Sequence, residues 1–319
     1  MSVLLKTLCA SGGGGAGADV LDYPSTLDIG DNISATITFE NVSADQSGCA
    51  VSVAIGAPFT VSASTFGPLA PAGTATLTVS ASASGAQSGT LTATGSDGPI
   101  SIPVTSALSV PIPTAWYHAD DIGIANGATV TSWADRRGSY NIVTTAGSSG
   151  NITYNTTGVG GSPAVNFPTA RWFTFPAGLR TALNSAGAIT VVVRGLCNNV
   201  AQYGGFIGTS TNGDQFFSLS NIQYANIASA TRLDYAYTTA EATASHVWAA
   251  TGTAGAQQYL RDNVSKGTSA NAFSLAATLT LGAWYRGGVA EGMDGRIREV
   301  RIYDRVLTGA ELTAVYNQM

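Results

Sequence analysis

Short runs of alternating apolar and polar residues follow one another along most of the chain. In the run "TATLTVSAS" (residues 74–82), Leu77 and Val79 fall on one side, while threonines and serines fall on the other. This period of two is typical of a strand with one buried face. Similar runs between turn residues fill residues 19–108, which we predict to form an immunoglobulin-like β-sandwich of about seven strands.

The same pattern returns in residues 114–319, in runs such as "AITVVVRG", "SHVWAATG" and "GRIREVRIYDR". More than about ten strands are expected there, too many for a second small sandwich, and a large two-sheet jelly roll is predicted. No stretch with helical periodicity is expected before the last ten residues. The prediction for the whole chain is therefore an all-β fold of two sandwiches with a short C-terminal helix.

The C-terminal segment carries the clearest local signals. Thr308 and Glu311 have the spacing of a capping box, which predicts a helix that begins at Gly309 and buries Leu312, Val315 and Tyr316. In the strand before it, simple alternation places Ile297, Glu299, Arg301 and Tyr303 on one face. Arg298, Val300 and Ile302 would share the other face. The arginines of this segment are expected to pair with nearby acids and carbonyl groups.

Glycine and proline divide the chain into four parts. The run "SGGGGAGA" (residues 11–18) is typical of a flexible connector, so residues 1–18 are expected to be an N-terminal anchor. Residues 109–113 lie in the proline-containing stretch "SVPIPTAW" and are expected to be a stiff linker. The two sandwiches then occupy residues 19–108 and 114–319.

Composition excludes two classes of function. Only 10% of the residues are charged, the net charge is −5 and the pI is about 4.9, which argues against nucleic-acid binding. No stretch approaches the roughly 20 apolar residues that span a bilayer, so membrane insertion is not expected. The three cysteines are widely spaced and are expected to be free thiols.

Four sequence stretches, in order, resemble one family. They are "WYHADD" (116–121), "ATVTSWADRRG" (128–138), "GVGGSPAVNF" (158–167) and "GRIREVRIYDRVLTGAELTAVY" (295–316). Together they resemble the laminin-G-like branch of the concanavalin A-like lectin/glucanase superfamily, over roughly residues 112–319. Residues 19–108 are similar, by strand pattern alone, to the immunoglobulin-like modules of bacteria and phages.

The resemblance bears on catalysis and on metal binding. Glucanase members carry a Glu-x-Asp-x-(x)-Glu strand, and since this chain has none, we predict a protein without enzymatic activity. Relatives often bind calcium through aspartates on rim loops, and calcium is the one cofactor that the resemblance suggests. The candidate ligands are Asp120, Asp121, Asp135 and Asp294. The alternative, which we favour for Asp135 and Asp294, is that these carboxylates satisfy turn amides.

Lectin-like members of this superfamily would stack an exposed aromatic ring on a sugar. The candidate platforms are Trp172, Tyr203, Trp248 and Trp284, whereas Trp116 and Trp133 are expected in the core. Loop residues that could complete a glycan site are Asn198, Asn212 and Asp214.

The leading functional hypothesis is a virion-surface protein of a bacteriophage, a head decoration or fibre or a tail accessory protein. The N-terminal region would attach to other virion proteins, and the lectin-like sandwich would bind host-surface polysaccharide. The first residues lack a signal peptide's apolar region, so synthesis in the host cytoplasm is expected. A homo-oligomer is also expected. The alternatives are a bacterial surface adhesin or carbohydrate-binding protein, and then a glycoside hydrolase.

Overall fold

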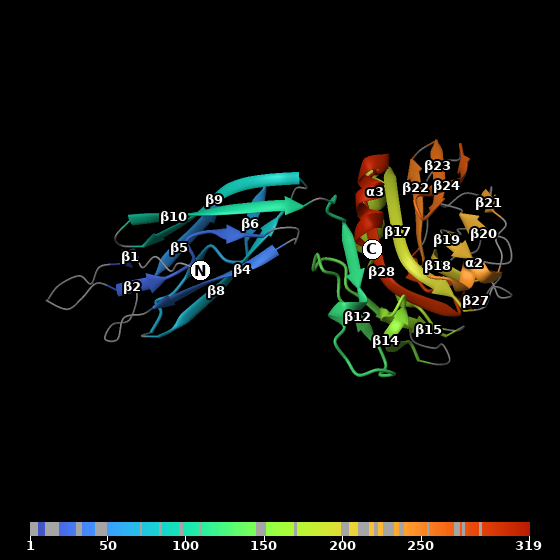
Figure 1. Ribbon diagram of the computed structural model, residues 1–319, viewed down its shortest axis with the longest axis horizontal. Coiled ribbons are helices and arrows are strands. Elements are labelled where there is room, and N and C mark those ends of the chain that lie inside the picture. Colours follow the sequence, from blue (N-terminus) through green and yellow to red (C-terminus); the bar gives the residue numbers. More distant parts are fainter. Residues whose placement is uncertain are drawn as a thin grey trace. The chain divides into compact units, whose positions relative to one another are not determined.

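The computed structural model divides the chain into two units, Met1–Ile112 and Pro113–Met319 (Figure 1). The boundary falls inside the stretch expected to be a linker. Each unit is a β-sandwich with its own core. The residues that the structure describes are 6–9, 19–29, 34–41, 50–70, 72–82, 85–95, 98–108, 110–144, 151–168, 171–198, 204–209, 217–219, 223–225, 233–235, 239–253, 255–270, 275, 278–286 and 289–319.

Unit 1 is an immunoglobulin-like sandwich whose described strands form two five-stranded sheets. The strands of the first sheet, in spatial order, are β1 (Lys6–Cys9), β2 (Asp19–Asp22), β4 (Ser34–Asn41), β8 (Thr74–Ala81) and β6 (Phe59–Val61). Those of the second are β3 (Leu27–Asp28), β10 (Gly98–Leu108), β9 (Gly85–Gly95), β5 (Val51–Ile55) and β7 (Thr65–Phe66). All pairs are antiparallel except β3 with β10.

The core of unit 1 confirms the alternation seen in the sequence. Leu77 and Val79 of β8 are buried beside Ile37 and Phe39 of β4, and the residues between them face outward. Nine strands are described in residues 19–108, where about seven were expected, because several are only two or three residues long and carry too little pattern to be recognised. The tenth strand, β1, lies within residues 1–18, which were expected to be an anchor, and it pairs with β2.

Unit 2 is a β-sandwich whose described strands form two large sheets and a hairpin. The back sheet contains, in order, β14 (Thr153–Val159), β15 (Ser162–Phe167), β28 (Gly295–Tyr303), β17 (Ala188–Cys197), β22 (His246–Thr253), β23 (Ala256–Arg261) and β24 (Val264–Ser269), with β11 (Ala115–His118) paired to β28. The front sheet contains β12 (Ser132–Trp133), β13 (Ile142–Thr144), β16 (Phe173–Thr174), β25 (Leu279–Leu281), β18 (Gly204–Thr209), β19 (Phe217–Leu219), β20 (Gln223–Ala225) and β21 (Leu233–Tyr235). A hairpin of β26 (Ala283–Arg286) and β27 (Val289–Gly292) completes the described strands.

Large aromatic side chains fill the space between the two sheets of unit 2. Tyr117, Trp133 and Phe173 meet edge to face, and Trp248 stacks on Tyr259 from the back sheet. Such contacts add about 0.5–1.5 kcal/mol each beyond the burial of apolar area. Cys197, a free thiol, is buried at the end of β17, and burial raises its pKa to about 12.

The C-terminal helix α3 (Gly309–Gln318) begins as the sequence predicts. Thr308 Oγ1 accepts from the Glu311 amide, and Glu311 Oε2 accepts from the Thr308 amide, so the capping box is complete. Hydrogen bonds from Arg305, followed by those from Thr308, lower the pKa of Glu311 to about 2. Leu312 and Val315 are buried, and Figure 1 shows α3 beside β17 and β28.

The expectation that no helix precedes the last ten residues is wrong. Helices α1 (Ala177–Ala186) and α2 (Thr239–Thr243) connect strands of unit 2. Helix α1 buries Leu179 and Leu183, and it ends at Gly187, whose φ of 65° is left-handed. Two apolar residues four positions apart are too weak a signal among strand-like neighbours. Of the described helices, none is long and apolar enough to cross a membrane.

The register of β28 differs from simple alternation. Arg194 lies opposite Glu299 and Gly195 opposite Ile297, so Arg298 is an extra residue in a β-bulge. The bulge lets both Ile297 and Val300 face the core. Ile297 therefore does not share the face of Glu299, contrary to the sequence prediction.

One glycine of unit 2 allows a close approach that no other residue permits. Gly282 has φ of 89°, and a Cβ added there would lie 2.2 Å from Cδ1 of Phe167. Gly282→Ala should therefore lower the free energy of unfolding by about 2 kcal/mol or more. All five tryptophans lie in unit 2, so tryptophan fluorescence during denaturant unfolding measures this unit alone.

Gly309→Ala is the matched control for this prediction. No atom lies within 4 Å of the added Cβ, and the residue is the first of helix α3. It should stabilise unit 2 by up to about 1 kcal/mol. Equal effects of the two substitutions would contradict the close packing at Gly282.

Candidate functional site

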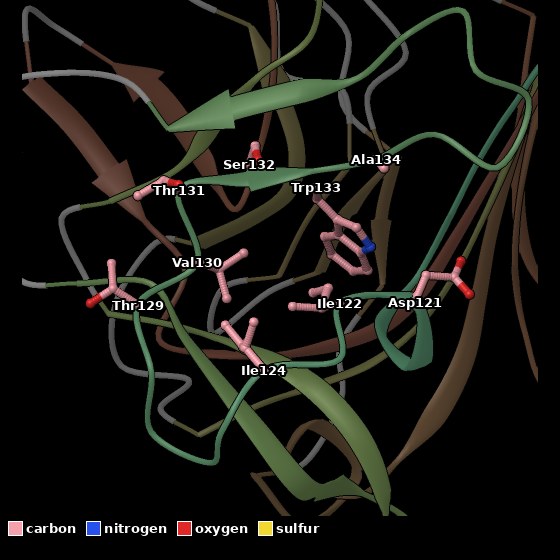
Figure 2. A pocket seen from close by; sticks show the side chains of 9 residues that line it. All are labelled: Asp121, Ile122, Ile124, Thr129, Val130, Thr131, Ser132, Trp133 and Ala134. Atoms are coloured by element: carbon pink, nitrogen blue, oxygen red, sulfur yellow. The ribbon is translucent and has the colours of Figure 1, made fainter.

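A pocket of about 280 Å³ opens beside strand β12 in unit 2 (Figure 2). The described residues that line it are Asp121, Ile122, Ile124, Thr129, Val130, Thr131, Ser132, Trp133 and Ala134. The volume is slightly below the roughly 300–1,000 Å³ of most small-molecule pockets. It therefore suits a small ligand.

The pocket has an apolar floor and a polar rim. Val130 and Trp133 belong to the core, and Ile122 packs against it. Figure 2 shows Ile122, Ile124 and Val130 converging toward the centre, with Asp121 at one end. The side chains of Asp121, Thr129, Thr131 and Ser132 are exposed around this floor. The rim thus offers three hydroxyl groups and one carboxylate as hydrogen-bonding partners.

Asp121 is held in place by a two-point ion pair. Its carboxylate accepts from Arg136 Nε at 2.5 Å and from Nη2 at 2.8 Å. The 3₁₀ turn η1 (Ala119–Asp121) that carries it is closed by the Ile122 amide, which donates to the Ala119 carbonyl. The turn begins at His118, whose Nδ1 accepts from the Asp120 amide. The pocket carboxylate therefore sits on a defined turn and has a defined partner.

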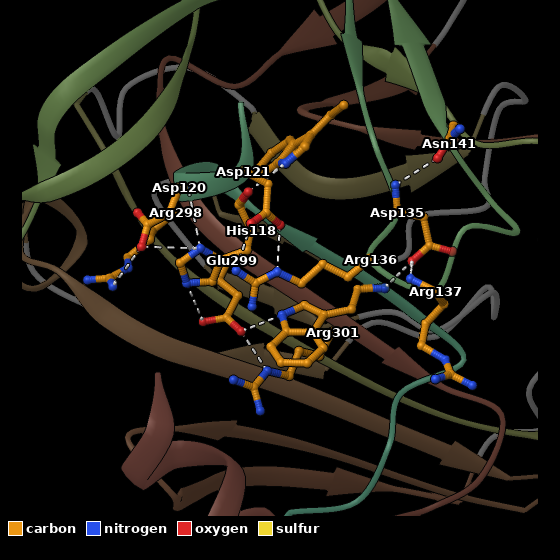
Figure 3. Close-up of polar contacts among 12 residues, drawn as sticks. His118, Asp120, Asp121, Asp135, Arg136, Arg137, Asn141, Arg298, Glu299 and Arg301 are labelled. Atoms are coloured by element: carbon orange, nitrogen blue, oxygen red, sulfur yellow. Dashed lines mark hydrogen bonds and ion pairs between the residues drawn. The ribbon is translucent and has the colours of Figure 1, made fainter. Parts of the chain in front are cut away.

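Behind the turn lies a buried polar network centred on Glu299 (Figure 3). Glu299 Oε1 accepts from Arg301 Nε at 2.6 Å and from Trp116 Nε1 at 2.7 Å. Its Oε2 faces His118 Nε2 at 3.6 Å. Because the Glu299 side chain is only 1% exposed, these contacts replace nearly all of its hydration.

The charge state of His118 follows from its surroundings. Burial lowers its pKa, and Glu299 opposes that effect only in part. Since Nδ1 accepts a hydrogen bond, the proton of the neutral ring lies on Nε2 and points at Glu299. His118 therefore faces the buried carboxylate as a neutral ring, at a distance longer than a hydrogen bond.

Trp116 connects the buried network to the pocket. The guanidinium groups of Arg301 and Arg136 both lie over its ring, at 4.5 and 4.6 Å from the centroid. Arg136 in turn holds Asp121. Trp116, expected in the core, instead lies partly exposed on the outer side of the sheet.

The four aspartates predicted as calcium ligands have other roles. Asp135 accepts from the amides of Trp116, Arg137, Ser139 and Tyr140 and so shapes a turn, as the favoured alternative predicted. Asp120 lies near His118 and Arg298, and Asp121 pairs with Arg136. In the described part of the chain, no three His, Cys, Asp or Glu residues group as a metal site.

Of the aromatic residues predicted as glycan platforms, Trp172 and Trp248 are described with their side chains, and neither is among the described residues that line the pocket. The prediction for Trp248 is wrong, because its indole is fully buried in the core and donates to the Gly195 carbonyl. Trp172 is half-buried, and of Trp284 only the strand is described. Tyr203 lies outside the described residues.

Of the three predicted loop residues, Asn198 is described. Asn198 donates from its backbone and its side chain to Asp294, so these two predicted site residues bind each other. Asn212 and Asp214 lie outside the described residues. Of all the predicted site residues, the structure places Asp121 alone in the described lining of the pocket.

The rim hydroxyls were missed by sequence reasoning. Thr129, Thr131 and Ser132 lie in "ATVTSWADRRG", which the sequence offered only as a family motif. Exposed hydroxyls on a strand are common, so nothing in the pattern marked them as a site. Their role depends on the loop that folds over from η1.

No protein-family model and no curated protein matches the sequence. Among solved structures, domain 4 of AbnA, an extracellular arabinanase from Geobacillus stearothermophilus, in complex with arabinotriose, matches with a TM-score of 0.48 and 18% identity, over 64% of this chain and 98% of that one. Trypanosoma rangeli sialidase in complex with sialic acid matches with a TM-score of 0.47 and 10% identity, over 93% of this chain and 60% of that one. The binding domain of botulinum neurotoxin DC in complex with SialylT matches with a TM-score of 0.42 and 13% identity, over 58% and 48%. Similarities at this level assign no residue role or ligand to this chain.

The buried network makes a prediction about stability. Glu299→Gln leaves Arg301 buried without a counter-charge, and the loss of one partner of such a pair costs about 3–5 kcal/mol. Denaturant unfolding followed by tryptophan fluorescence should show this loss in unit 2.

Arg137→Gln is the control, because its side chain stands apart from the network in Figure 3. It should change the stability by less than about 0.5 kcal/mol. If Glu299→Gln unfolded at the same denaturant concentration as the wild type, the network would not stabilise unit 2.

Proposed function

We propose that unit 2 is a non-enzymatic glycan-binding domain and that the pocket beside β12 is its binding site. The observation that carries this proposal is the combination of an apolar floor with a rim of three hydroxyls and one oriented carboxylate. Saccharides present hydroxyl groups on their edges and C–H groups on their faces. The rim would exchange hydrogen bonds with the hydroxyls, and the floor would contact a ring face.

The proposal of binding without hydrolysis rests on the number of acids. Canonical glycosidases place two carboxyl groups about 5–10 Å apart across the scissile bond. The described lining of the pocket has one carboxylate, Asp121, and Arg136 neutralises it. A single carboxylate in this position can accept hydrogen bonds from a saccharide, but it has no second acid to act with it.

The proposed role of the whole chain is that of a bacteriophage virion-surface protein, made in the host cytoplasm and assembled as a homo-oligomer. Unit 1 would attach it to the capsid or tail, and unit 2 would bind host-surface polysaccharide. Two sandwiches with a buried, free thiol at Cys197 support this proposal, since cysteines of proteins made in the cytoplasm are kept reduced. Peptide mass spectrometry of purified phage particles should detect the chain. Its detection in bacterial surface fractions, and not in particles, would favour an adhesin.

Glycan binding is tested with the labelled full chain on an array of bacterial surface polysaccharides. Saturable binding that a soluble saccharide competes is expected. Asp121→Asn should weaken that binding about tenfold, because a charge-assisted hydrogen bond becomes a neutral one. Thr131→Val, which removes a hydroxyl but keeps the side-chain shape, should weaken it several-fold.

Asp304→Asn is the matched control, because Asp304 is exposed in unit 2 and does not line the pocket. It should bind like the wild type. Absence of saturable binding to every polysaccharide, or full affinity in Asp121→Asn, would contradict the proposed site.

A further inference from the structure

Two arginines lie close together on the outer face of the back sheet. In β17, Val191 and Val193 face the core, so Arg194 after them points to the outer side. The β-bulge brings Arg298 of β28 to the same region, where the charge of Arg298 contributes to lowering the pKa of Arg194. The two residues therefore lie on the same outer face of the sheet, on neighbouring strands at the bulge.

Few partners neutralise these two side chains. Within the described residues, Arg194 makes no hydrogen bond or ion pair. Arg298 approaches one carboxylate, Asp120, at 3.9 Å, and its buried Nε has no partner (Figure 3). The neighbouring Arg296 donates to the Gly158 carbonyl, and its buried Nε also lacks a partner. Donor capacity thus remains unused in a region of partial burial.

The nearby acids do not balance the charge. Arg194, Arg296, Arg298 and Arg301 bring four positive charges, and Asp120 and Glu299 bring two negative ones. Glu299 is already engaged by Arg301 and Trp116. Burial, then Arg298, lowers the pKa of Arg194, and the charge of Glu299 opposes these effects only in part. A bound anion would relieve both the desolvation and the repulsion.

The backbone beside Arg194 leaves room for its side chain. Gly160, in the turn between β14 and β15, has φ of 59°, and a Cβ there would lie 3.3 Å from Arg194 Nη2. The guanidinium group therefore rests against bare backbone. A planar guanidinium held in this manner suits two-point recognition of a carboxylate or sulfate.

The turn η1 links this region to the pocket. Asp120 of the turn faces Arg298, and the next residue, Asp121, lines the pocket. We infer that Arg194 and Arg298 form an oxyanion-binding site that takes the carboxylate or sulfate of an acidic saccharide whose neighbouring ring occupies the pocket. The assignment of the oxyanion to a saccharide rests on the proposed glycan function, whereas the oxyanion site itself is argued from the arginines alone.

The oxyanion site is tested by NMR of the arginine side-chain Nε–H groups in the full chain. Sodium sulfate and glucuronate should each shift the signals of Arg194 and Arg298 saturably, measured against sodium chloride at equal ionic strength. Arg298→Gln should raise the dissociation constant for sulfate about tenfold. If neither anion produced a saturable shift in the wild type, the site would be refuted.

Two further variants separate the site from general charge and from folding. Arg137→Gln removes the same charge elsewhere and should leave sulfate binding unchanged. Arg298→Lys keeps the charge without the planar fork and should bind sulfate more weakly than the wild type but more tightly than Arg298→Gln. Equal losses in Arg137→Gln and Arg298→Gln would reduce the effect to net charge and overturn the inference.

Comparison of saccharides identifies the carrier. A disaccharide of glucuronate and glucose should bind more tightly than either glucose or sulfate, because its two rings can engage the arginines and the pocket together. Asp121→Asn should reduce binding of this disaccharide but keep sulfate binding, so that failure of the pocket and failure of the arginine site are distinguishable. Tighter binding of sulfate or inorganic phosphate than of the disaccharide would overturn the acidic saccharide as the ligand.

Discussion

The burial of one carboxylate, Glu299, is the constraint on which the organisation of the candidate site depends. A charged group that is 1% exposed must find partners, and it finds Arg301 on its own strand, Trp116 on β11 and His118 at the start of η1. Those partners fix the strand that enters unit 2 and the turn that follows it. Arg136 packs on Trp116 and pairs with Asp121, so the position of this pocket carboxylate also depends on the buried network.

Much of the fold was predictable from the sequence because its signals are local. The alternation around Leu77 and Val79 needs no distant partner to be recognised, and the structure buries both residues. The Thr308–Glu311 capping box likewise specifies the start of α3 within four residues. Two β-sandwiches and a terminal helix follow from such signals taken together.

The candidate site was largely not predictable, because its contacts join distant parts of the chain. Trp116 and Glu299 are 183 positions apart, so no local pattern could indicate their contact. Nor could alternation indicate the bulge at Arg298, which changes the faces on which the residues of β28 lie. The sequence singled out Asp121, but for calcium and not for a pocket carboxylate paired with Arg136. Trp248 was chosen for its aromatic ring, yet burial depends on which strand faces the core, and β22 turns this residue inward. The hydroxyl residues that do line the pocket, Thr129, Thr131 and Ser132, carry no sequence signal that distinguishes them from other exposed strand residues.

The central claim, that unit 2 binds a saccharide in the pocket beside β12, is tested most directly by amide NMR of the isotope-labelled full chain with oligosaccharides from a bacterial surface polysaccharide. The account predicts that the largest saturable shifts fall on Asp121–Ile124 and Thr129–Ser132 and on the indole of Trp133. Shifts confined to other parts of unit 2, or no saturable shift from any such oligosaccharide, would contradict it.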